Sequence, residues 1–251
     1  MPYQYAYPEE RTRPAVDLLS RIPTFAPASV IDLGCGPGFS SALLARAFPK
    51  AQIVGVDIND DALDIARAHL PQVRFEKSDL TQWSPEKTYD LVFSNGALQW
   101  LPDHHALLPK LLGAVGPGGY LAVQIPNNLH EPNRALMRMV AADGPWAKRL
   151  VPIAKTRPTI EAFEDLHSSL WPFCQWMDLW ETTYVHLLDN VWSIIEWMTA
   201  TGLRPFLEPL REDERKNFLA LYAKELSRAY PALPDGKVLL RFPRLFILAR
   251  R

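Results

Sequence analysis

The sequence predicts an α/β fold in which a mostly parallel β-sheet is covered by helices on both faces. Short runs rich in β-branched residues alternate with helical patterns over the first half of the chain, and a glycine-rich turn follows the first run. Such alternation is typical of parallel sheets, because parallel strands are joined by crossover helices. With 251 residues and 48% hydrophobic composition, the chain can bury a sizeable core.

The first run, 30–33, is followed by the turn Gly34-Cys35-Gly36-Pro37-Gly38 and a predicted helix over 39–48. Glycine has no Cβ, so such a turn can adopt positive φ and lie against a ligand, although it can also serve only close helix–strand packing. A dinucleotide fingerprint would place its third glycine one residue later, where Phe39 stands. The turn is therefore a candidate nucleotide site, and NAD is a poor match.

Polar side chains end the next three runs. These runs and their polar ends are 52–58 with Asp57, 73–79 with Asp79, and 89–95 with Asn95. Ligands of open parallel sheets bind outside the carboxyl ends of the strands, so we expect these side chains and Asp32 to meet at one edge. A carboxylate in the position of Asp57 suits a ribose diol, because it accepts two hydrogen bonds. Each acid could instead cap the helix that follows it.

A second helix is predicted after residue 59, with Asn59 or Asp60 as its N-cap and Pro71 beyond its end. A fifth strand is predicted over 120–125, after the glycine-rich stretch 116–119. These elements complete the alternation of strand and helix.

Apolar spacing near the N-terminus predicts a helix that begins at Pro14 and continues through Ile22. After residue 125 the composition changes, and the proline-rich segment 126–172 has the length of a lid or binding element. Strands are predicted over 180–187 and 244–249, with helical patterns between them. We expect one domain, 1–251, that divides into an N-terminal arm (1–26), a core (27–125, 176–190 and 240–251) and a helical substrate cap (126–175 and 191–239).

The charge is nearly balanced, with 27 basic and 28 acidic residues, and no long basic run indicates a nucleic-acid partner. No apolar stretch reaches the ~20 residues of a membrane span, and residues 1–5 lack the pattern of a signal peptide. We therefore expect a cytoplasmic protein without a membrane partner; the sequence does not set its oligomeric state. Cys35 and Cys174 form neither a disulfide framework nor a zinc spacing, and we expect His104 and His105 to be exposed residues of a helix start, so no metal site is predicted.

The turn motif D-L-G-C-G-P-G, followed by the ordered polar strand ends, resembles the class I S-adenosylmethionine (SAM)-dependent methyltransferase family. The resemblance implies a Rossmann-like sheet with an antiparallel last strand, SAM as cofactor and S-adenosylhomocysteine as product. It places the glycines under the methionine part of SAM, Asp32 near its ammonium group, Asp57 at the ribose and Asp79 at the adenine amine. The cofactor contacts that it implies are Asp32, Gly34, Cys35, Gly36, Gly38, Asp57, Ile58, Asp79, Leu80 and Asn95.

Four further motifs are similar to the trans-aconitate 2-methyltransferase family: E-R-T-R-P near the start, L-Q-W-L-P-D after the fourth run, T-A-T-G-L-R-P at 199–205 and F-P-R-L-F near the end. This resemblance spans nearly the whole chain. It implies methyl transfer from SAM to a carboxylate of trans-aconitate, and an N-terminal arm that folds over the cofactor.

A carboxylate with a pKa near ~4 is already a nucleophile at neutral pH, so we expect catalysis by positioning, with no catalytic residue. Arginines suit a polycarboxylate substrate, because the guanidinium pairs with a carboxylate through two parallel hydrogen bonds. The expected substrate contacts are Arg11, Arg13, Gln99, Trp100, Tyr184, His186, Arg204 and Arg244. Each arginine could instead form a surface salt bridge. A methyltransferase for another small molecule and a noncatalytic SAM-binding module are the alternative functions.

Overall fold

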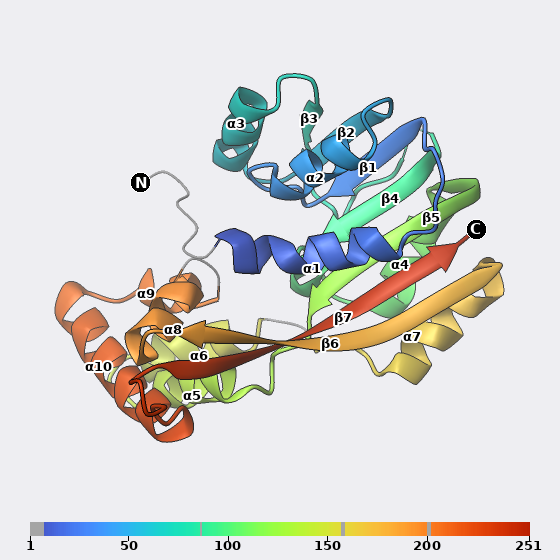
Figure 1. Cartoon of the computed structure of the whole chain (residues 1–251). Helices are drawn as coiled ribbons and strands as arrows, with labels where there is room; N and C mark the ends of the chain where they lie inside the picture. Colours follow the sequence, from blue (N-terminus) through green and yellow to red (C-terminus); the bar gives the residue numbers. More distant parts are fainter. Residues whose placement is uncertain (1–7, 86, 157–158, 200–201) are drawn as a thin grey trace.

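A computed structural model describes residues 8–85, 87–156, 159–199 and 202–251 of the protein (Figure 1). Its strands are β1 (Ser29–Leu33), β2 (Gln52–Asp57), β3 (Arg74–Lys77), β4 (Tyr89–Asn95), β5 (Val115–Pro126), β6 (Trp176–Leu188) and β7 (Val238–Arg250). Its helices are α1 (Pro8–Arg21), α2 (Phe39–Ala47), α3 (Asp60–His69), α4 (His104–Gly113), α5 (Pro132–Ala142), α6 (Ala147–Ala154), α7 (Phe163–Leu170), α8 (Val191–Thr199), α9 (Arg204–Leu207) and α10 (Glu212–Ala229), with short 3₁₀ turns η1 (Leu98–Trp100) and η2 (Trp171–Phe173).

The strands form one sheet in the order β3-β2-β1-β4-β5-β7-β6. Strands β1 to β5 pair in parallel, whereas β7 is antiparallel to both of its neighbours. The predicted mostly parallel sheet with an antiparallel last strand is thus confirmed. Because Leu33 pairs with Val56 and Asp32 with Phe93, the carboxyl ends of β1, β2 and β4 lie level at one edge.

Helices bury both faces of the sheet, as expected for parallel strands that are apolar on both sides. On one face, α1, α2 and α3 pack against the strands through residues such as Leu18, Leu44 and Leu63. On the other face, α4 and α7 pack through residues such as Leu112 and Leu166. The two hydrophobic layers hold the strand ends, and the turns that follow them, in fixed positions.

A helical cluster with its own core lies at one end of the long β6–β7 ribbon (Figure 1). Helices α5, α6, α8, α9 and α10 meet there around Trp146, Trp197 and Phe218, which are almost fully buried. Helix α7 belongs to the same stretch of sequence as α5 and α6 but covers the sheet. No helix in the described part of the chain is both long and apolar enough to cross a membrane.

Two expectations about helix starts are corrected by the structure. Helix α1 begins at Pro8, ahead of the predicted start at Pro14, because a proline is equally suited to the first turn at the earlier position. His104, expected to be exposed, is fully buried at the start of α4. Its ring nitrogens lie 2.8 Å from Glu161 Oε2 and 2.9 Å from the Leu98 carbonyl oxygen. Glu161 is distant in sequence, so local pattern could not reveal this burial.

Gly34 is required by both its backbone and its surroundings. Its φ is 73°, and a Cβ placed there would lie 2.2 Å from Ala97 Cβ. We therefore predict that Gly34→Ala lowers the free energy of unfolding by roughly 2–5 kcal/mol, the sum of left-handed strain and overpacking, in urea titrations. Gly113→Ala is the control, because a Cβ at Gly113 meets nothing within 4 Å and alanine favours a helix. Equal stabilities of the two variants would contradict this account.

Candidate functional site

A cavity of about 570 Å³ lies at the carboxyl edge of the parallel strands, a size typical of small-molecule sites. Its floor is formed by the turns after β1, β2, β3 and β4, and its remaining walls by α1, β7 and the helical cluster. It brings together many of the residues selected from the sequence: Arg11, Gly34, Cys35, Gly36, Asp57, Ile58, Asp79, Leu80, Asn95, Gln99, Trp100, Arg204 and Arg244. The lining does not include Asp32, Gly38, Arg13, Tyr184 or His186.

Asp57 organises the floor of the cavity at the end of β2. Its Oδ2 accepts a hydrogen bond from the Gly36 amide at 2.8 Å, and its Oδ1 accepts one from the Asn59 amide at 2.9 Å. Each carboxylate oxygen keeps a further lone pair for a ligand hydroxyl. A Cβ at Gly36 would meet nothing within 4 Å, so the backbone there is open to the cavity.

Asp32 lies behind this floor and is fully buried. The hydroxyls of Ser40 and Ser41 donate to its Oδ2 at 2.7 and 2.6 Å. Burial raises the pKa of Asp32 to about 6, against the lowering effect of the two hydroxyls, and the nearby Asp57 charge adds to the increase. Asp32 therefore supports the start of α2, whose Ser40 itself lines the cavity.

The side chains of Asp79, Asn95 and Gln99 place hydrogen-bond acceptors around the cavity. Thr81 donates to Asp79 Oδ1 through its amide at 2.9 Å and its hydroxyl at 2.8 Å, and these bonds lower the pKa of Asp79. Gln99 Nε2 donates to the Gly96 carbonyl at 2.5 Å. Asn95 Oδ1 and Gln99 Oε1 are buried and accept no hydrogen bond from the described residues. Both oxygens are available to a donor on a ligand.

Arginines gather at the opposite end, where α1 and β7 meet the helical cluster. Arg11 Nη2 donates to the Trp197 carbonyl at 2.8 Å, and its Cζ lies 4.5 Å from the Trp197 ring centroid. Arg244 is 7% exposed, and its Nη1 donates to Gln124 Oε1 at 3.2 Å. Arg204 is exposed and pairs with Glu208 at 2.8 Å. The guanidiniums of Arg11 and Arg244 are thus held by aromatic, carbonyl and amide neighbours.

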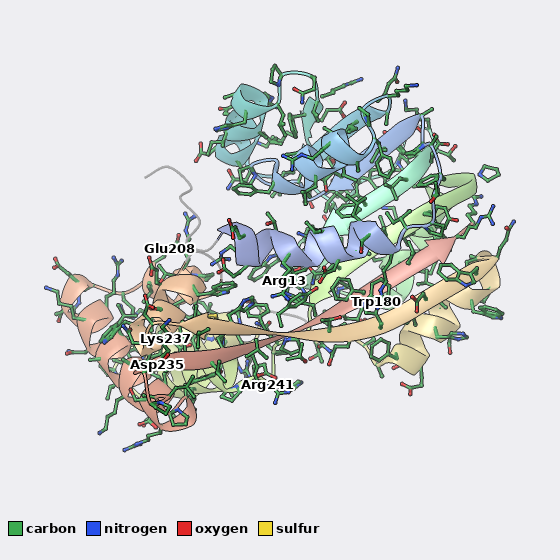
Figure 2. All side chains as sticks on the ribbon, in the orientation of Figure 1. Arg13, Trp180, Glu208, Asp235, Lys237 and Arg241 are labelled. Carbon is green, nitrogen blue, oxygen red and sulfur yellow. The ribbon has the colours of Figure 1, made fainter. Side chains whose placement is uncertain are left out.

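The predicted substrate residues that do not line the cavity form a layer behind it. Figure 2 shows Arg13 on the side of α1 that faces β6 and β7. Arg13 Cζ lies 5.4 Å from the Tyr184 ring, and the Tyr184 hydroxyl donates to Asp17 Oδ2 at 2.5 Å. His186 packs on Trp197 with ring centroids 4.5 Å apart. The contacts of Tyr184 with Arg13 and Asp17 attach α1 to β6, and the contact of His186 with Trp197 attaches β6 to α8.

The shifted pKa values of His186 and Cys35 suit neither group to act as a general base at neutral pH. The pKa of His186 is lowered to about 4 by burial and by the charges of Arg244, Arg13 and Arg11, so this ring is neutral at physiological pH. Burial strongly raises the pKa of the Cys35 thiol. Among the described lining residues there is no histidine, lysine or tyrosine.

Charge is divided between the two ends of the cavity. Within the described lining, the acids are Asp57 and Asp79, on the β2–β3 side, and the bases are Arg11, Arg134, Arg204 and Arg244, on the side of α1, β7 and the helical cluster. The cavity can therefore hold a cationic group at one end and a multiply charged anion at the other.

Comparison with known proteins places this site in a family. The family model described as "Methyltransferase domain" matches residues 30–119. A trans-aconitate 2-methyltransferase from Methylobacterium nodulans is 50% identical over 245 residues, covering 98% of this chain and 95% of the relative. A protein of the same name from Variovorax paradoxus is 45% identical, again covering 98% of this chain and 95% of the relative. The chain belongs to the trans-aconitate 2-methyltransferase family.

Solved structures agree with the fold of this family. The YcgJ protein from Bacillus subtilis superposes with a TM-score of 0.62 at 12% identity, covering 95% of this chain and 98% of that chain. A phosphoethanolamine N-methyltransferase 2 from Haemonchus contortus, solved with S-adenosyl-L-methionine, gives a TM-score of 0.54 at 15% identity and covers 94% of this chain and 52% of that chain. Identities this low support the fold alone, and the predicted Rossmann-like methyltransferase sheet is confirmed.

Sequence reasoning missed several lining residues of this family member. They are Thr12, Ala15, Pro37, Phe39, Ser40, Asn59, Ser78, Gly96, Ala97, Leu101, Pro126, Arg134, Trp197 and Phe242. Arg134 had a detectable signal, because it occupies the buried stripe of α5 together with Met137 and Ala141. An arginine at an apolar position of an amphipathic helix indicates a buried charge, and buried charges are commonly functional. Trp197 and Phe242 had no such signal, since core aromatics show the same pattern.

We predict that Asp57→Asn weakens SAM binding by roughly tenfold or more, because one lone-pair-bearing oxygen is replaced by a donor and hydrogen bonds to a charged group contribute ~1.5–3 kcal/mol. Isothermal titration calorimetry measures the effect. Asp61→Asn, at an exposed site in the first turn of α3, is the control. Unchanged SAM affinity of Asp57→Asn would remove Asp57 from the cofactor site.

The raised pKa of the buried Asp32 leads us to predict that the stability of the protein depends on pH. Its folded-state pKa of about 6 exceeds the ordinary 3.8, so its contribution to stability is complete below the lower value and is lost as pH rises through the higher one. Relative to the wild type, Asp32→Asn should therefore gain roughly 3 kcal/mol of unfolding free energy between about pH 4 and pH 7. Urea titrations without ligand measure this; parallel pH curves for the two proteins would show that Asp32 does not titrate as described.

Proposed function

We propose that this protein transfers the methyl group of SAM to a carboxylate of trans-aconitate, giving the monomethyl ester and S-adenosylhomocysteine. The different residues at the two ends of the cavity carry this proposal: the acids at one end can accept hydrogen bonds from the ribose hydroxyls and the adenine amine of SAM, and the arginines at the other end suit a small polyanion. The names of the relatives at 45–50% identity agree with the same reaction.

The residues at the acidic end fit the cofactor. Asp57 would hold the ribose diol, the open backbone at Gly36 would lie against the methionine part, and Asp79 would accept from the adenine amine with Ile58 and Leu80 beside the base. The other proposed contacts are Gly34, Cys35 and Asn95, with Asp32 and Gly38 supporting the turn from behind. When bound, SAM supplies an electrophilic methyl group. The buried acceptor oxygen of Asn95 is suited to the donors of its ammonium group.

The residues at the basic end fit the acid. Arg11 and Arg244 would pair with carboxylates of the substrate, and Arg204 would do so from the rim, with Gln99 and Trp100 contributing further contacts. Arg13, Tyr184 and His186 would act from the layer behind, by holding α1 on β6. An ion pair gains more in such a partly buried site than at the surface, where water screens it.

The chain's residues act by positioning and by excluding water. A carboxylate is ionised at neutral pH, so no proton has to be removed from the nucleophile. Holding the oxygen in line with the methyl group can contribute ~7–11 kcal/mol to barrier reduction. Trp100, Trp197 and Phe242 present apolar surface to this region and displace water from the reacting groups.

A different acceptor, such as a phenol or an amine, fits the cavity less well. These groups are protonated at neutral pH and lose a proton on methylation, which a general base would accept. The neutral, buried His186 and the absence of histidine, lysine and tyrosine from the described lining favour an acceptor that is already ionised.

We also propose a cytoplasmic location and a division of labour along the chain. Both cysteines are free, as is typical of a reducing compartment. The core of 27–125, 176–190 and 240–251 would bind SAM, the arm of 1–26 would cover it, and the cap of 126–175 and 191–239 would select the acid.

The proposed reaction predicts SAM-dependent turnover of trans-aconitate at a rate nearly flat from roughly pH 6.5 to 9, since the carboxylate nucleophile is already ionised and His186 stays neutral over this range. Mass spectrometry of the monomethyl ester measures it. A steep rise of kcat through neutral pH that His186→Gln abolishes would show that a base is needed.

Arg244→Gln should raise the KM for trans-aconitate by roughly tenfold to a hundredfold while the SAM dissociation constant changes less than about twofold. The reason is that a charge-assisted pair is lost only at the basic end, where the substrate would bind. Arg241→Gln is the matched control on the same strand, since Arg241 is exposed (Figure 2). A loss confined to SAM affinity would assign Arg244 to the cofactor.

A further inference from the structure

A buried arginine stands where the main cavity meets a smaller one. Arg134 in α5 is 5% exposed and lines the main cavity. Together with Trp100 it also lines an adjoining cavity of about 40 Å³, whose other walls come mainly from the helical cluster. A space of this size holds about three water molecules or one small polar group. The guanidinium therefore lies at the deep, cap-side end of the site.

Gly202 lies against this guanidinium and leaves space for it. A Cβ at Gly202 would lie 1.5 Å from Arg134 Nη1 and 2.4 Å from its Cζ. The φ of Gly202 is not in the left-handed region, so the backbone conformation does not require glycine. The missing side chain instead leaves the space that the guanidinium occupies.

Two tyrosine hydroxyls fix the backbone next to Arg134. Tyr230 Oη accepts from the Asn133 amide at 3.0 Å, and Tyr222 Oη donates to the Asn133 carbonyl at 2.8 Å. Both tyrosines are buried in the helical cluster. Because these two bonds fix the start of α5, little backbone entropy is lost there when the guanidinium binds an anion.

We propose that Arg134, seated against Gly202, is the residue that distinguishes a tricarboxylate from a dicarboxylate; this rests on the proposed function. A tricarboxylate that presents one carboxylate to the methyl group has two left to be paired. Arg244 and Arg134 are the buried arginines of the described lining and enter from different elements, β7 and α5. Arg134 binds the carboxylate that points toward the cap, and its planar fork gives that contact its direction.

The test compares trans-aconitate with mesaconate, cis-glutaconate and itaconate, three dicarboxylates that each lack a different one of its carboxylates, as substrates or as competitive inhibitors. Arg134→Gln should lower kcat/KM for trans-aconitate by roughly tenfold to a hundredfold. The loss should disappear with the dicarboxylate that lacks the contacted carboxylate. Arg228→Gln removes an exposed arginine of α10 and is the control variant. SAM affinity and the unfolding midpoint are measured for this variant and for Arg134→Gln.

Gly202→Ala is the sharper variant, because it retains the charge and displaces only the guanidinium. It should cause the same selective loss, and Arg134→Lys should restore part of the affinity but not the selectivity. These two variants decide the question if Arg134→Gln does not fold. An equal loss with all four acids, or no loss with any, would overturn the role of Arg134. Wild-type protein that does not methylate trans-aconitate would instead overturn the proposed function.

Discussion

The carboxylate of Asp57 joins the two backbone segments from which the acidic end of the site is built. One oxygen holds the amide of Gly36 in the glycine turn, and the other holds the amide of Asn59 at the start of α3. Asn59 in turn caps that helix by accepting from the Ala62 amide at 3.1 Å. A single side chain at the end of β2 thus fixes the shape of the turn, the entry to the next helix and the acceptors offered to a ligand.

The basic end depends on helix α1, which closes the cavity. Arginines of this helix lie over aromatic rings of α8 and β6: Arg11 over Trp197, Arg13 over Tyr184 and Arg21 over Trp180, at 4.5, 5.4 and 4.3 Å. A guanidinium over an aromatic ring contributes ~0.5–2 kcal/mol, depending on how far it is desolvated. The contacts that attach α1 therefore also place Arg11 in the cavity. In the proposed function, Arg11 would thus serve both the closure of the cavity and the recognition of an anion.

The long ribbon of β6 and β7 links the sheet to the helical cluster. Its sheet end carries Phe246 and Leu248 into the core, and its far end carries Leu240 and Phe242 into the cluster. Arg244 lies between these two pairs, at the point where the ribbon leaves the sheet. The antiparallel addition of β7 thus allows one sheet to carry both the floor of the cavity and the helical cluster.

The sequence by itself determined the mostly parallel sheet and the residues at the acidic end of the cavity. Those features follow from local patterns, since a strand, its terminal acid and the next turn are contiguous in the chain. Asp57, Asp79 and Asn95 could be selected for this reason, and so could the glycine turn. The basic end was only partly predictable, because the chain contains many arginines and sequence does not tell which of them are buried.

Tertiary structure alone decided which arginines face the cavity. It placed Arg13 behind the wall and Arg134 in it, and it buried His104 against Glu161, which lies 57 residues away. It also explains Gly202, whose missing side chain makes room for a guanidinium that is 68 positions earlier in the chain. Contacts of this kind join segments that are far apart in the chain; the periodicity of a helix can indicate that Arg134 is buried, but not which residues it meets.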